Sequence, residues 1–129
     1  MVSAALRMER VVAIAFAICL IGACAVHVAD LLRYGWLPYH FAPRLVNVYW
    51  TSLTFFDALA ALLLLCSMRI GLFLTLAIIA SDVAFNLFAR FGLGLHLQPL
   101  ALWLQILFFI AVVGATVYAQ RNEAITRAI

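Results

Sequence analysis

The sequence predicts an all-α integral membrane protein, a bundle of four transmembrane helices whose neighbours run antiparallel. The composition is the first reason, since 69% of the 129 residues are hydrophobic and only 10% are charged. A soluble domain is nearer half apolar and a quarter charged. The mean hydropathy of +1.19 agrees. The second reason is that four apolar runs are each long enough to cross about 30 Å of hydrocarbon.

The predicted spans are residues 11–32, 48–66, 70–89 and 100–119. The first follows two arginines and ends at "RYGWLPYHFAPR", a segment with one glycine and two prolines. The turn "SMR" separates the second span from the third, and "RFGLGLHLQP" precedes the fourth. Glycine, proline and polar residues of this kind are typical of turns. We therefore expect one transmembrane domain over residues 1–129, with no separate soluble module.

The arginines predict the direction of the spans. Five lie on one side, Arg7, Arg10, Arg69, Arg121 and Arg127, and three on the other, Arg33, Arg44 and Arg90. Positive residues favour the cytoplasmic side, so both termini are expected in the cytoplasm. Arginine without lysine suggests a GC-rich genome and a bacterial inner membrane. Alternatively, "IGAC" ending at Cys24 resembles a lipoprotein signal, although the apolar run continues to Leu32.

Other ligand classes find little support in the sequence. A net charge of +3 is too small for a nucleic-acid surface. Cys19, Cys24 and Cys66 lie in apolar runs without CxxC spacing, so we interpret them as small buried apolar side chains. The three histidines, His27, His40 and His96, share no metal-ligand spacing. We expect no metal and no cofactor.

Polar residues inside the predicted spans fall into stripes at helical spacing. The second span contributes Asn47, Trp50, Thr51, Thr54 and Asp57, and the third contributes Thr75, Asp82, Asn86 and Arg90. The first contributes His27 and Asp30, and the fourth Gln98 and Gln105. These stripes converge on the half nearer the two longer loops, the outer half. The inner halves hold almost nothing polar, which predicts a polar recess open on one side and argues against a channel.

Asp57 and Asp82 are the most informative pair. Both lie about 12–14 Å below the outer boundary by helical rise, on antiparallel neighbours. Two close carboxylates cannot both stay ionised without a cation, so the pair could act as an acid and a base in proton transfer. The structural alternative is a protonated carboxyl that donates to Asn86 or Thr54 and holds the helices together.

Two further features each have two readings. Asp30 lies three residues after His27, so it could orient the imidazole as a second base, or it could pair with Arg33 or Arg44. The loop of residues 33–44 could fold over the recess as a lid, or its aromatic residues could form an interfacial belt.

We therefore expect an outward-opening intramembrane pocket that binds, and could transform, a small lipophilic molecule; whether it is an enzyme stays open. Asp57, Asp82 and His27 are the candidate catalytic residues, and the candidate ligand-binding residues are Thr51, Thr54, Asn86, Gln105, Trp50 and Asp30. Membrane lipids are expected partners. The alternatives are an accessory subunit of a larger membrane complex, approached along the small residues of "DALAAL", or a proton-coupled transporter acting as a homodimer.

Overall fold

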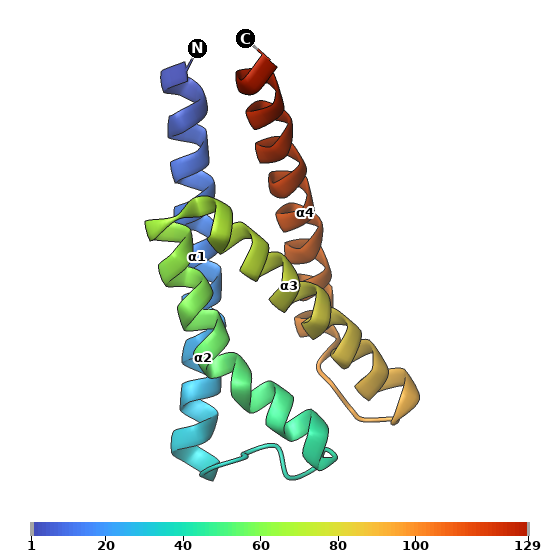
Figure 1. Cartoon of the computed structure of the whole chain (residues 1–129). Helices are drawn as coiled ribbons and strands as arrows, with labels where there is room; N and C mark the ends of the chain where they lie inside the picture. Colours follow the sequence, from blue (N-terminus) through green and yellow to red (C-terminus); the bar gives the residue numbers. More distant parts are fainter. Residues whose placement is uncertain (1, 129) are drawn as a thin grey trace.

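The structure, a computed structural model, describes residues 2–128 and is helical throughout apart from its connections (Figure 1). The helices are α1 (Val2–Tyr34), α2 (Arg44–Cys66), α3 (Met68–Leu87), the π-helix η1 (Phe88–Gly92) and α4 (Pro99–Ala128). Four of these segments are long and apolar enough to span a membrane. The prediction of an all-α four-helix membrane bundle is confirmed, and the chain is a multi-pass membrane protein.

The helices extend beyond the apolar runs that predicted them. α1 begins nine residues before the predicted span at residue 11, and α4 continues nine residues past residue 119. α2 begins directly after Pro43, whose fixed backbone suits the start of a helix. A helix is bounded by caps and breakers, whereas hydropathy marks only its apolar part, so this difference is expected.

The α2–α3 hairpin forms the centre of the bundle. α1 packs on α2, and α4 packs on α3, whereas α1 and α4 meet sparsely. Both termini lie at one end of the molecule, and the two longer loops lie at the other (Figure 1). We call these the terminus end and the loop end. The outward sides of α1 and α4 expose large apolar residues such as Ile18 and Leu107, as contact with lipid requires.

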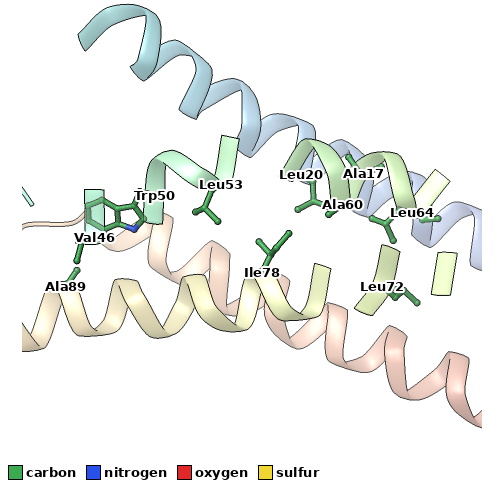
Figure 2. Close-up of a cluster of buried hydrophobic side chains, with 12 residues drawn as sticks. Ala17, Leu20, Val46, Trp50, Leu53, Ala60, Leu64, Leu72, Ile78 and Ala89 are labelled. Carbon is green, nitrogen blue, oxygen red and sulfur yellow. The ribbon is translucent and has the colours of Figure 1, made fainter. Parts of the chain in front are cut away.

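Buried apolar side chains pack together along the interior, from Val46 and Trp50 at the loop end towards the α2–α3 turn (Figure 2). Ala17, Leu20, Ala60 and Leu64 are buried together with Leu72 in one apolar cluster. A Cβ at Gly71 would collide with the backbone of α2 at positions 63 and 64, so this glycine sets the closest approach of the hairpin arms. Ala60 and Ala61 of the "DALAAL" segment are buried against other residues of this chain.

The loop between α1 and α2 is fixed by side-chain hydrogen bonds. Gly35, at φ +82°, ends α1 by donating its N–H to the carbonyl of Leu31 at 2.9 Å. Asn47 in α2 then donates to the Leu37 carbonyl at 2.9 Å and accepts from the Tyr39 N–H at 3.2 Å. These bonds turn the chain back over the loop end of the bundle.

The prediction of buried cysteines is wrong for two of the three. Cys19 and Cys66 are exposed on the outside of the helices, where lipid serves an apolar thiol as well as a core does. Cys24 is half-buried and donates through its thiol to the Thr54 carbonyl at 3.2 Å.

Candidate functional site

A pocket of about 310 Å³ lies at the loop end, between all four transmembrane helices. Its lining comes from α1, both loops, α2, α3 and α4, and comprises Val26, His27, Asp30, Tyr39, Phe41, Trp50, Asp82, Asn86, Leu97, Gln98, Ala101, Leu102 and Gln105. We call this the loop-end pocket. Its volume is within the range that small-molecule sites occupy, and its lining mixes apolar walls with a few convergent polar groups.

Three lining residues form a hydrogen-bonded chain on the α1 side. Nδ1 of His27 lies 2.6 Å from the Tyr39 hydroxyl, which donates to Oδ2 of Asp30 at 3.1 Å. Because the hydroxyl hydrogen is used by Asp30, the consistent arrangement has Nδ1–H of His27 donating to the Tyr39 oxygen. Nε2 of His27 then keeps its lone pair. Asp30 does support the imidazole, but through Tyr39.

Tyr39 stays a neutral donor between His27 and Asp30. Its burial, followed by the charge and the hydrogen bond of Asp30 and the charge of Asp82, raises the pKa of its hydroxyl well above the ordinary value. The structure records no ion pair between Asp30 and Arg33 or Arg44 in the part of the chain that it describes, so the contact of Asp30 with Tyr39 takes the place of the expected pairing.

Asn86 is the centre of a second network, on the α3 side. Its Oδ1 accepts from the Trp50 indole N–H at 2.8 Å. Its amide nitrogen donates to Oδ1 of Asp82 at 3.2 Å and to Oε1 of Gln105 at 2.8 Å. One buried side chain therefore links α2, α3 and α4 at the floor of the loop-end pocket. With three partners, Asn86 is held in one orientation.

The two aspartates differ in their surroundings. Asp82 lines the pocket, and among the described residues its second carboxylate oxygen has no hydrogen-bond partner. Asp57 is 3% exposed and lies outside the lining, with no recorded hydrogen bond in the described chain. The two carboxyl groups are close enough to interact electrostatically. Near Asp57, the buried hydroxyl of Thr54 has no partner among the described residues.

A larger hollow of about 830 Å³ lies at the opposite end. It is bordered by the α2–α3 turn, by Glu9 of α1 and by Thr116, Ala119, Gln120 and Asn122 of α4. We call it the terminus-end groove. Of the apolar cluster in Figure 2, Leu72 also borders this groove, whereas Ala60 and Leu64 line neither hollow.

Six of the nine predicted site residues line the loop-end pocket, namely His27, Asp30, Trp50, Asp82, Asn86 and Gln105. Thr51, Thr54 and Asp57 are buried outside its lining. Thr51 donates to Oδ1 of Asn47 at 3.3 Å. Tyr39 and Phe41 were not predicted as site residues, although both belong to the loop that could act as a lid. His40 and His96 are exposed in the loops.

Comparisons of this chain with protein-family models, with characterised proteins and with solved structures found no match. What the loop-end pocket can do chemically follows from its own groups. It offers an imidazole nitrogen with a lone pair, two carboxyl groups, three amide side chains and three aromatic rings. Such a set suits hydrogen bonding, proton acceptance and cation recognition.

Proposed function

We propose that this membrane protein binds a small lipophilic molecule in the loop-end pocket, with proton transfer as the chemistry its polar groups suit. The observation that carries the proposal is the pocket itself, which lies among four membrane-spanning helices and mixes apolar walls with His27, Asp82 and Gln105. Ionisable side chains at this depth are costly for a membrane protein, so their convergence on one cavity favours a role in function.

The chain His27–Tyr39–Asp30 supports the proton-transfer part. A proton taken up at Nε2 of His27 would be balanced through Tyr39 by the Asp30 carboxylate, in the way that a carboxylate supports the histidine of other acid–base pairs. Asp82 presents a second carboxyl to the same cavity. Asp57 lies outside the lining and feels the charge of Asp82.

Binding is favoured over conduction by the dry interior. A permeant ion would have to pass the apolar cluster that includes Ala60, Leu64 and Leu72. Ion pathways need polar groups or water along their whole length.

We also propose that both termini face the cytoplasm of a bacterial inner membrane, because the arginine excess lies on that side. The loop-end pocket then opens towards the outer surface. Fusion of a reporter that fluoresces only in the cytoplasm to the C-terminus tests this orientation. Fluorescence is the expected result. A dark fusion would reverse the assignment if a reporter that is active only in the periplasm is active at the same position.

Native mass spectrometry of the protein extracted with its own lipids tests the binding proposal. The wild-type protein should retain a small molecule, and Ala101→Phe, which fills the pocket from α4, should lose it. Ala111→Phe is the matched control, because Ala111 is an exposed alanine of the same helix, as Ala101 is, but lies outside the pocket lining. Equal retention in Ala101→Phe, or no retained molecule in the wild type, would refute the pocket. A stoichiometric partner protein instead of a small molecule would favour an accessory subunit.

A further inference from the structure

The charges that line the loop-end pocket are of one sign. Asp30 and Asp82 are acidic, and none of the described lining residues is arginine. The arginine that comes near, Arg90, donates to the Leu97 carbonyl at 2.7 Å and lies over the Phe91 ring. An anionic head group inside the pocket would therefore meet two carboxyl groups without a lining arginine to offset them.

Asp30 and Asp82 also bring acceptor atoms to the lining of this cavity. Oδ2 of Asp30 accepts from Tyr39, and Oδ1 of Asp82 accepts from Asn86. For the second oxygen of each carboxyl group, the structure records no hydrogen bond within the described residues. Among the fully buried side-chain polar atoms of the described residues, only the Thr54 hydroxyl lacks a partner, so the second oxygens of Asp30 and Asp82 are not fully buried. Because both side chains line the cavity, these oxygens are available to a hydrogen-bond donor or a cationic group of a ligand.

Three aromatic rings form one wall of the pocket. The Trp50 ring lies 5.3 Å from the Tyr39 ring and 6.1 Å from the Phe41 ring, measured between centroids. Tyr39 and Phe41 are 6.4 Å apart and nearly perpendicular. Aromatic faces attract ammonium groups, and desolvation strengthens that attraction. The aromatic wall therefore favours a cationic ligand, as the carboxyl groups do.

The pocket also reaches the apolar outside of the bundle. Val26 and Phe41 belong to its lining, yet they are 61% and 62% exposed. Since α1 and α4 meet sparsely, with Phe16 and Phe108 in edge-to-face contact at 5.3 Å, the wall between them is open to the side. A hydrocarbon chain could leave along this route into the bilayer.

We propose that the ligand of the loop-end pocket is a cationic amphiphile, a protonated amine or a quaternary ammonium compound with one alkyl chain. The head group lies between Asp30 and Asp82 against the wall of Tyr39, Phe41 and Trp50, and the chain passes between α1 and α4. This inference rests on the proposed function and adds the chemical class of the ligand.

The test uses Trp50 as the reporter, in a Trp36→Phe, Trp103→Phe background. Trp36 and Trp103 are 70% and 64% exposed, so their removal leaves the pocket intact. Dodecyltrimethylammonium, dodecanol and dodecanoate are titrated into the protein in dodecyl maltoside, and the change in Trp50 fluorescence gives each affinity. The cationic probe should bind about tenfold more tightly than the neutral one, and the anionic probe most weakly.

Variants identify the groups responsible. Asp82→Asn and Asp30→Asn should each weaken the cationic probe about tenfold and leave dodecanol within about threefold. Glu9→Gln is the matched control, because it removes a carboxylate at the terminus-end groove. Tighter binding of dodecanol or dodecanoate to the wild-type protein would overturn the cationic class while leaving the pocket in place. If no probe changes Trp50 fluorescence, and Ala101→Phe behaves as wild type, the proposed function falls as well.

Discussion

The two halves of the α2–α3 hairpin are held together by different interactions. Towards the terminus end, Ala60, Leu64 and Leu72 pack tightly, and Gly71 lets the backbones approach closely. Towards the loop end, Trp50 and Asn86 join the helices through a hydrogen bond of 2.8 Å beside a cavity. The same two helices thus change from dry packing to polar contacts along their length.

This difference indicates which side chains the pairing of α2 and α3 requires. The half towards the terminus end closes mainly with small and aliphatic residues. Its buried Thr75 donates to the Gly71 carbonyl of its own helix, so no recorded polar side-chain bond pairs α2 with α3 in this half of the described chain. In lipid, where the hydrophobic effect does not drive helix association, close packing of this kind is the usual source of stability. The polar half places the Asp82 carboxyl beside a cavity, with one oxygen that no described residue bonds, which costs stability and is expected of a site.

The largest effect is expected where packing is tightest. Gly71→Ala places a methyl group against the backbone of α2 at positions 63 and 64 and should lower the free energy of unfolding by about 3 kcal/mol. Gly22→Ala is the control, since a Cβ there meets nothing within 4 Å. Thermal unfolding in detergent measures both. Equal stability of the two variants would show that the hairpin arms are not in close contact.

A smaller loss of stability is expected when Asn86, the central residue of the polar half, is replaced. Asn86→Leu leaves the Trp50 N–H and Gln105 without their partner and should cost about 2 kcal/mol. The exposed Gln120→Leu should change stability by less than about 0.5 kcal/mol. The same unfolding assay compares them, and a neutral Asn86→Leu would mean that the network does not hold α4 in place.

Hydropathy and helical period were sufficient to predict the helices and six of the thirteen residues that line the loop-end pocket. Asp82 and Asn86 are four residues apart, so one face of α3 had to carry both, and His27 and Asp30 share a face of α1 for the same reason. The spans followed from the thickness of the bilayer, which leaves few lengths open to an apolar run.

Periodicity does not predict how helices cross or where a loop returns. Asp57 has the depth of Asp82 in the sequence, but its side chain lies outside the lining because the packing of α1 on α2 decides what the buried face of α2 contacts. Tyr39 enters the site because Asn47 holds the loop at Leu37 and Tyr39. No local pattern encodes that long-range pair of bonds.

The hydroxyl of Tyr39 links the α1–α2 loop to His27 and Asp30 of α1, and its removal should show in the pH dependence of stability. Tyr39→Phe should cost about 1 kcal/mol at neutral pH. Burial and Asp30 raise the pKa of Tyr39 in the folded protein, so the wild type loses stability as the pH rises above about 10, the value in the unfolded chain.

Unfolding at pH 8 and pH 11 therefore gives a steeper loss for the wild type than for Tyr39→Phe. The other tyrosines are common to both proteins, and their contributions cancel in the difference. Parallel losses in the two proteins would contradict the buried contact of Tyr39 with Asp30.

A small gain is expected where the polar half carries a group that it does not use. The Thr54 hydroxyl is buried without a partner among the described residues, so Thr54→Val should stabilise the protein by up to about 1 kcal/mol. Thr75→Val is the matched control, because it loses a hydrogen bond of 2.7 Å to the Gly71 carbonyl and should not stabilise. Destabilisation by Thr54→Val, together with loss of the bound molecule, would make this hydroxyl part of the site.

The smallest effect is expected in the terminus-end groove, which is larger than the loop-end pocket but lacks its convergent network. Gln120→Phe puts a ring into the groove from the exposed side of α4, as Ala101→Phe does in the pocket. Native mass spectrometry should find the bound molecule retained in Gln120→Phe and lost in Ala101→Phe. The reverse outcome would move the ligand to the terminus end, and the unpaired carboxyl oxygens at the loop end would then need a purely structural reason. Volume alone favours the groove, whereas the converging carboxyl groups and aromatic rings favour the pocket, so this pair of variants decides which of the two properties identifies a site in this bundle.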